Sequence, residues 1–113
     1  MKTYTYFDSK ISKELTIKVG ENAQENWDII SCSDQSDIWF HLYKNPSPHV
    51  VLCTENNKKI AKTSIKYAAS LCKEYSKLSD LKNVKVVYTY IKNVKKSDTI
   101  GSVYTSNTTI ICV

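Results

Sequence analysis

Residues 37–52 read DIWFHLYKNPSPHVVL, and this segment contains both histidines of the chain and one of its two tryptophans. Alternation across residues 37–42 predicts a β-strand that places Trp39 and His41 on one half-exposed face and Phe40 with its aliphatic neighbours on the other. The turn at Pro46–Pro48 then returns the chain into a second apolar strand, at residues 49–53. The two histidines are therefore expected beside an aromatic ring at a turn between two strands.

The residues before this segment predict a β-hairpin followed by a short helix. Residues 1–7 and 15–19 alternate or run apolar, and a polar turn at residues 8–10 separates them, as in two paired strands. Residues 21–30 carry Ala23, Trp27 and Ile30 at helical spacing, which predicts the short helix.

The segment from about residue 55 to residue 78 has a strong helical period. Its apolar residues, among them Ala68 and Leu71, gather on one broad arc, and Thr54 or Asn57 is the expected N-cap. The opposite side carries what we call the lysine stripe, which consists of Lys59, Lys62, Lys66, Lys73 and Lys77. Like charges four residues apart destabilise a helix by a few tenths of a kcal/mol, roughly, per pair. The stripe therefore favours an anionic partner, with a solvated helix face as the alternative.

The last third of the chain predicts a buried strand and a terminal hairpin. The strand covers residues 84–91 and is rich in β-branched and aromatic residues. A cationic cluster of Lys92, Lys95 and Lys96 follows it, and residues 104–113 read as a hairpin around 106–108. The expected fold is a single α+β domain, residues 1–113, with a mostly antiparallel (mixed) β-sheet, one long amphipathic helix packed across it and one short helix.

The charge of the chain is positive and unevenly distributed. Residues 1–57 carry 5 lysines and 8 acidic residues, whereas residues 58–96 carry 11 lysines and 2 acidic residues. All 16 basic residues are lysine, so the chain has no guanidinium fork for bidentate contacts to guanine or phosphate. This composition favours charge-driven binding that tolerates sequence over base-specific readout.

Cysteine usage and hydropathy argue against several classes of protein. The four cysteines lie in apolar segments without zinc-finger spacing, which favours buried free thiols over disulfides or a metal site. No apolar run reaches the ~18 residues that a membrane span requires. The first residues lack the apolar stretch of a secretory signal. We therefore expect a soluble cytoplasmic protein with no cofactor and no membrane partner.

The 37–52 segment, together with residues upstream of it, resembles a known family. The resemblance rests on Asp37, Trp39, His41, Pro46 and His49, preceded by Gly20, Asn22 and Asn26. This pattern resembles the NFACT-R domain, the RNA-binding domain of ribosome quality-control factors. The chain departs from it at Ser47, where the family has glycine, and at Pro48, where it has serine.

The resemblance implies a stand-alone, non-enzymatic RNA-binding module. Its expected ligand is tRNA or ribosomal RNA in a ribosome quality-control context, with the ribosome and DNA as further partners to test. The expected phosphate contacts are Lys59, Lys62, Lys66, Lys73, Lys77, Lys85, Lys92, Lys95 and Lys96. Trp39, Tyr43 and Tyr90 are candidates for stacking on unpaired bases.

Two other functions remain open from the sequence. Asp37, His41 and His49 could form an acid/base pair or bind a divalent metal in an RNA-processing enzyme, or they could simply hold the turn in place. The lysines could instead dock an acidic protein.

Overall fold

The computed structural model describes residues 1–113 and contains a six-stranded sheet in the order β1-β2-β4-β3-β5-β8, in which every pairing is antiparallel. The strands are β1 (Lys2–Asp8), β2 (Lys13–Val19), β3 (Ile38–Leu42), β4 (Val50–Leu52), β5 (Lys85–Tyr90) and β8 (Thr109–Cys112). A second, two-stranded sheet pairs β6 (Val94–Lys96) with β7 (Val103–Thr105). The helices are α1 (Ala23–Cys32), α2 (Lys62–Glu74) and the single 3-10 turn η1 (Ile91–Asn93).

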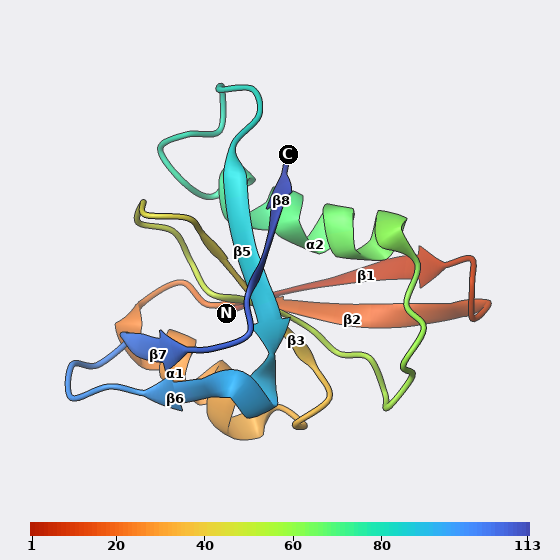
Figure 1. Ribbon diagram of the computed structural model, residues 1–113, viewed down its shortest axis with the longest axis horizontal. Helices are drawn as coiled ribbons and strands as arrows, with labels where there is room; N and C mark the ends of the chain where they lie inside the picture. The colour runs from red at the N-terminus through yellow and green to blue at the C-terminus, as the bar shows by residue number, and fades with distance from the viewer.

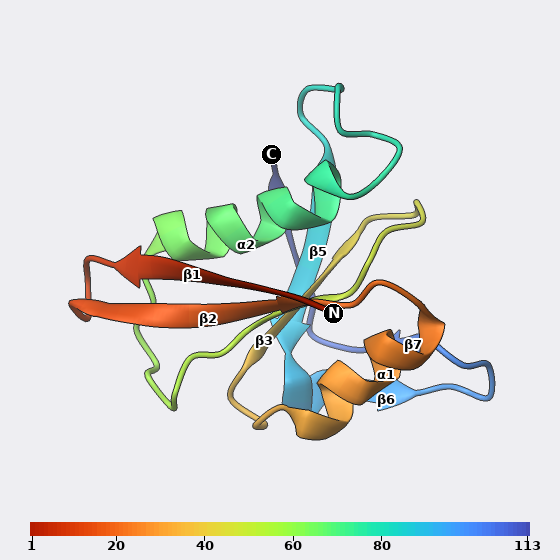
Figure 2. The same ribbon diagram turned by 180° about the vertical axis from the view of Figure 1, so that it is seen from behind.

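The helices lie on opposite sides of the main sheet. Helix α2 packs against β1 to β5, whereas α1 contacts β2 and β4 from the other side. Figure 1 shows α2 above β1 and β2, and α1 below them with the β6–β7 hairpin beside it; Figure 2 shows the same arrangement from behind. The α+β fold with one longer and one shorter helix is confirmed.

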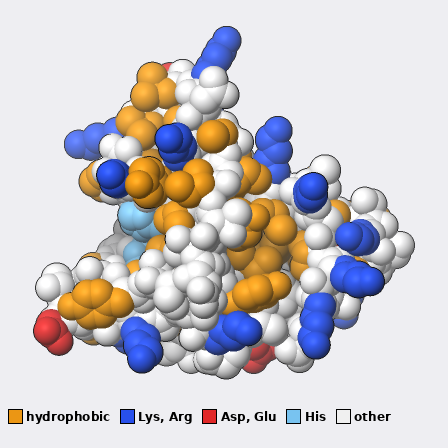
Figure 3. Space-filling view, in the orientation of Figure 1, with side chains coloured by type: hydrophobic (Ala, Val, Ile, Leu, Met, Phe, Trp, Pro, Cys, Tyr) orange, Lys and Arg blue, Asp and Glu red, His pale blue; other side chains and the backbone are white.

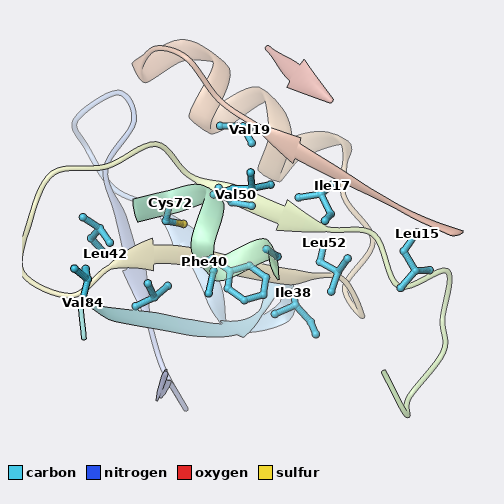
Figure 4. Close-up of a cluster of buried hydrophobic side chains, with 14 residues drawn as sticks. Leu15, Ile17, Val19, Ile38, Phe40, Leu42, Val50, Leu52, Cys72 and Val84 are labelled. Atoms are coloured by element: carbon cyan, nitrogen blue, oxygen red, sulfur yellow. The ribbon is translucent and has the colours of Figure 1, made fainter. Parts of the chain in front are cut away.

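The alternation in β3 divides the hydrophobic core into two clusters. Phe40 and its aliphatic neighbours on β3 face α2 and pack with β2, β4 and the α2 residues Ala68 and Cys72. Figure 4 shows Phe40 and Cys72 within this cluster. Trp39 faces the other way and packs with Ile29 of α1, Val51, Ile91 and Val94. Burying a large apolar side chain contributes about 1.5–3 kcal/mol, so Trp39, which is only 3% exposed, is a core residue. The expected half-exposed position of this tryptophan was wrong.

Helix α2 begins later than the sequence predicted. The chain from residue 55 to residue 61 is not helical, and Glu55 and Asn56 have φ angles of 53° and 65°. Neither Thr54 nor Asn57 caps the helix, because Ala61 occupies the N-cap position and has no side chain that could do so. The carboxylate of Asp8, at the end of β1, accepts instead from the Ala61 amide and the Ser64 hydroxyl. A residue more than fifty positions away therefore defines where α2 begins.

The expected C-terminal hairpin does not form. Strand β7 pairs with β6, and β8 pairs with β5, so the two predicted partners belong to different sheets. The turn between them is fixed by Thr89 on β5, whose hydroxyl lies within hydrogen-bonding distance of the Ser106 and Asn107 carbonyl oxygens. The pairing of β7 with β6 and of β8 with β5 depends on long-range contacts, which a local turn pattern does not predict.

The cysteines are less uniform than expected. All four are unpaired, but only Cys72 is buried, Cys53 is half-buried, and Cys32 and Cys112 are exposed. The structure contains no group of three or more metal-ligating side chains. It also contains no helix with the length and apolar character needed to cross a bilayer.

Candidate nucleic-acid interface

An open cleft of about 1070 Å³ lies where segments distant in the sequence meet. We call it the cleft. Its walls are the β2–α1 connection, the β3–β4 turn, residues 75–78 after α2, and the loop between β6 and β7. Figure 3 shows histidine side chains, in pale blue, inside a hollow between two raised parts of the surface.

Three rings form the inner part of the cleft. Trp39 and His41 are two residues apart on β3 and so share a face, where they stack with 7° between their planes and 5.8 Å between centroids. The antiparallel register pairs Phe40 with Val50, which brings His49 beside His41. His49 is nearly perpendicular to both rings, 5.3 Å from Trp39 and 5.2 Å from His41.

Hydrogen bonds fix the hydrogen positions on both imidazoles. The Trp39 Nε1–H donates to Nδ1 of His49 over 3.1 Å, so the hydrogen of the neutral His49 ring is on Nε2. His41 Nδ1 lies 2.7 Å from the Leu42 carbonyl oxygen, which can only accept, so the hydrogen of His41 is on Nδ1 and its Nε2 holds a lone pair. The two histidines therefore present one hydrogen-bond donor, Nε2 of His49, and one acceptor, Nε2 of His41.

Burial keeps both histidines neutral. It lowers the pKa of His49 to about 4, with a further lowering by the neighbouring charge of protonated His41. Burial also lowers the pKa of His41, against an opposing effect of the hydrogen bond to Leu42. At neutral pH the two rings are thus polar but uncharged, which suits contacts to neutral polar groups better than contacts to phosphate.

Gly20, Asn22 and Asn26 each have a definable role beside the rings. Asn22 caps α1 by accepting from the Glu25 amide over 2.9 Å. Asn26 accepts from the His49 amide over 3.1 Å, and the Gly20 amide donates to the His49 carbonyl over 3.0 Å. A Cβ on Gly20 would lie 2.2 Å from Oδ1 of Asn26, so only glycine fits against this asparagine.

The turn from Pro46 to Pro48 forms one edge of the cleft without needing a glycine. Ser47, which stands where the resemblance leads one to expect glycine, has no left-handed φ angle. Its hydroxyl accepts from the Leu42 amide over 3.0 Å and donates to the Pro48 carbonyl over 2.9 Å. A side chain thus supplies the hydrogen bonds that hold this turn against β3.

The opposite wall, formed by residues 100–103 and Thr105, was missed by sequence reasoning. Gly101 has a φ angle of 86°, and a Cβ there would lie 2.8 Å from Cβ of Ala23 on α1. The indole of Trp27 donates to the Ser102 carbonyl over 2.9 Å, which ties this loop to α1. Gly101 was the one local signal in the sequence that this loop approaches α1 closely.

The lysine stripe is shorter than predicted and leads toward the cleft. Lys62 and Lys66 are exposed on α2, and Lys77 follows the helix and lines the cleft. Lys73 is half-buried and donates to the Val113 carbonyl over 3.4 Å. Lys59 lies in the non-helical segment before α2 and therefore does not continue the stripe.

The other predicted lysines lie apart from the stripe and at the two ends of β5. Lys85 begins β5, whereas Lys92, Lys95 and Lys96 follow its far end and belong to the side of the sheet opposite α2. Lys96 contacts the Ser31 hydroxyl and lies 5.6 Å from the Trp27 ring centroid. The two groups of lysines therefore do not join into one continuous patch.

Two of the three candidate stacking residues are accessible. Tyr43 and Tyr90 are exposed, with Lys44 and Lys92 at 5.2 and 5.5 Å from their ring centroids. Trp39 is buried, so it supports His41 from behind and has no free face for a base.

Asp37 is separated from the histidines. Its two carboxylate oxygens accept from the amides of Asp34 and Thr54, both over 2.9 Å, and it does not line the cleft. It joins the start of β3 to the end of β4. The structure therefore does not assemble the Asp37–His41–His49 site that was one alternative for catalysis or metal binding.

Known proteins match this chain over most of its length. Residues 2–110 match the family described as NFACT protein RNA binding domain. The chain is 38% identical over 98 residues to coiled-coil domain-containing protein 25 of Mus musculus, covering 81% of the chain and 47% of that protein. It is 35% identical over 83 residues to Rqc2 homolog RqcH of Bacillus subtilis, covering 73% of the chain and 14% of that protein. The chain thus spans about half, or less, of the length of these relatives.

A solved structure supports the same fold. The C-terminal part of the fibronectin/fibrinogen-binding protein from Streptococcus suis matches all of the chain and 45% of that structure, with a TM-score of 0.83 and 24% identity. At this identity the likeness concerns the fold alone. The sequence match over residues 2–110, which includes every residue that shapes the inner cleft, shows that the chain belongs to the NFACT protein RNA binding domain family.

Proposed function

We propose that this chain binds tRNA or ribosomal RNA in ribosome quality control, through phosphate contacts along the lysine stripe. The family description supports binding to RNA, and the name of the Bacillus subtilis relative supports the ribosome quality-control setting. The observation that carries the proposal is the exposure of Lys62 and Lys66 on α2 together with Lys77, which follows the helix and lines the cleft. A cytoplasmic location follows from this role.

The expected binding is dominated by charge. Lysine supplies mobile point charges and no bidentate fork, so phosphate contacts set the position of the RNA and contribute little sequence selectivity. DNA of the same length is therefore expected to bind as well, with modest discrimination. Lys85, Lys92 and Lys95 are proposed as a second set of contacts, on the other side of the sheet. We propose no catalytic step, because the Asp37 carboxylate accepts from two backbone amides away from the histidines.

The stripe is tested by titrating labelled tRNA with the protein across a series of salt concentrations, with fluorescence anisotropy as the measurement. The variant Lys62→Gln/Lys66→Gln/Lys77→Gln removes three charges and leaves Lys73, which contacts Val113, in place. The matched control, Lys10→Gln/Lys13→Gln/Lys58→Gln, removes the same charge outside the proposed contacts. Each lost phosphate contact reduces the slope of log K against log salt by about 0.7–0.9. The stripe variant, which loses three contacts, is therefore expected to lose about 2.1–2.7 units of slope.

Two results would count against the proposal. Equal slopes for the stripe variant and the control would show that net charge, and not the stripe, determines binding. Competition by poly-glutamate as effective as competition by unlabelled tRNA would favour docking of an acidic protein. Circular dichroism on every variant checks that the fold is retained.

A further inference from the structure

We propose that the cleft takes one unstacked nucleobase of the bound RNA, with His41 and His49 contacting its polar edge. This inference rests on the proposed RNA binding and adds a base-binding site to the phosphate surface. It concerns the inner part of the cleft, whose rim carries Lys77, the last residue of the stripe.

The first support is a pair of unused ring atoms. The Trp39 indole occupies Nδ1 of His49, and the Leu42 carbonyl occupies Nδ1 of His41, while neither Nε2 atom has a protein partner. The structure leaves no buried side-chain polar atom without a hydrogen bond. Because Nε2 of His49 has no such partner, this atom must be accessible even though the residue is only 3% exposed. Both Nε2 atoms therefore open into the cleft that these residues line.

The second support is the chemistry of these two atoms. Nε2 of His49 is a donor and Nε2 of His41 is an acceptor, as fixed by their Nδ1 partners. Phosphate or carboxylate oxygens require donors alone, so the pair is poorly matched to an anion. The edges of nucleobases carry adjacent donors and acceptors, which single-stranded RNA exposes when a base leaves the stack. A donor and an acceptor on rings whose centroids lie 5.2 Å apart match such an edge.

The third support is the position of the cleft relative to the lysines. A volume of about 1070 Å³ slightly exceeds the roughly 300–1,000 Å³ of ordinary small-molecule sites, so a nucleotide fits with its sugar. Lys77 lines the cleft and also ends the stripe, so an RNA backbone that follows α2 arrives at this opening. His41 is half-exposed, and the parallel Trp39 ring packs against one of its faces and holds it in place.

The test uses the fact that the chain has only two histidines. Protein labelled with ¹⁵N at histidine is titrated with each of the four ribonucleoside monophosphates, and the imidazole nitrogen signals are recorded by NMR. Ribose 5-phosphate is the control without a base. The expected result is a saturable shift of both Nε2 signals with at least one nucleotide and none with ribose 5-phosphate.

A variant separates base contact from general perturbation. His41→Phe keeps a ring on Trp39 but removes the acceptor, and a single hydrogen bond contributes about 0.5–1.5 kcal/mol. Nucleotide affinity, followed through His49, is therefore expected to fall about 2-fold to 10-fold. Tyr104→Phe, at an exposed position outside the cleft lining, is the matched control and is expected to bind as the unchanged protein does.

The outcomes distinguish this inference from the proposed function. Shifts of equal size with ribose 5-phosphate would assign the cleft to sugar or phosphate and overturn the base contact. Equal shifts with N-acetyl-trialanine amide would make it a peptide-docking cleft and overturn it as well. If tRNA binding depends on the stripe but no nucleotide moves the histidine signals, the inference fails and RNA binding stands. If nucleotides bind and tRNA does not, the cleft serves a free nucleotide and the proposed function fails instead.

Discussion

Gly20 shows how a single position sets the shape of the cleft. Its amide donates to His49, and the space that a side chain would fill is taken by Oδ1 of Asn26, which itself accepts from the His49 amide. The two residues therefore hold the backbone of His49 from both sides. Sequence could indicate that Gly20 and Asn26 belong together, through the family resemblance, but not that the asparagine occupies the place of the glycine's missing side chain.

Gly20→Ala is expected to destabilise the protein by about 1–3 kcal/mol, because Asn26 must move and leave the buried His49 amide without its acceptor. Urea unfolding measures the change. In the double variant Gly20→Ala/Asn26→Ala the conflict with Oδ1 of Asn26 is already removed. The losses in the free energy of unfolding caused by the two single variants should therefore be clearly less than additive. Additive losses would mean that the alanine is accommodated elsewhere and that the close contact does not limit this position.

At the scale of elements, the sequence predicted those strands and helices whose signals are local. The β1–β2 hairpin, the alternation in β3 and the presence of both helices follow from periods of two or 3.6 residues. The start of α2 does not, because Ile60 fits the apolar arc of a helix but packs on the core from the non-helical segment before α2. The pairing of β7 and β8 with different strands is equally long-range. Local sequence patterns predict neither the start of α2 nor the pairing of β7 and β8.

Asp8 is the residue that joins two of these elements. One carboxylate oxygen accepts from the amides of Lys10 and Ile11 in the β1–β2 turn, and the other accepts from Ala61 and Ser64 at the start of α2. Burial alone would raise the pKa of Asp8, but these four hydrogen bonds outweigh it and lower the pKa below its ordinary value. The group therefore stays ionised in the folded protein.

Asp8→Asn is expected to cost about 2 kcal/mol or more, because the amide nitrogen that replaces one oxygen must face backbone donors. Urea unfolding gives the free energy, and amide hydrogen exchange in the first turn of α2 shows where protection is lost. Glu14→Gln, at an exposed position on the neighbouring strand, is the control. A loss no larger than the control's would show that α2 begins at Ala61 without help from Asp8.

At the scale of the whole molecule, the cleft is a product of tertiary assembly. The signature histidines and the Gly20–Asn26 pair were visible in the sequence, but the wall at residues 100–103 and Thr105 comes from a hairpin tied to α1 by Trp27. The burial of Trp39 is likewise set by a second cluster that α1 and η1 complete. A periodic pattern defines which face a residue is on, and only the other elements decide whether that face is covered.

This assembly makes the stability of the fold depend on pH through His49. Its pKa is about 4 in the folded protein against an ordinary value of 6.5, so between these values the unfolded chain binds a proton that the folded chain excludes. Stability is then complete above about pH 6.5 and falls as the pH decreases, by about 3 kcal/mol at pH 4. The lowered pKa of His41 acts in the same direction. The lowered carboxyl pKa values of Asp8, Glu21 and Glu25 add losses only below their ordinary values of 3.8 to 4.5.

Urea unfolding at intervals from pH 7.5 to pH 4.5 measures this dependence. The unchanged protein is expected to lose stability most steeply between pH 6 and pH 4.5, with a slope approaching about 1.4 kcal/mol per pH unit for one excluded proton. His49→Gln keeps an acceptor for the Trp39 indole but does not titrate, so its profile should be flatter by about that slope. Matching profiles for the two proteins would mean that His49 takes up its proton in the folded state. The donor and acceptor positions in the cleft would then change within the acidic range, and nucleobase binding would have to change with them.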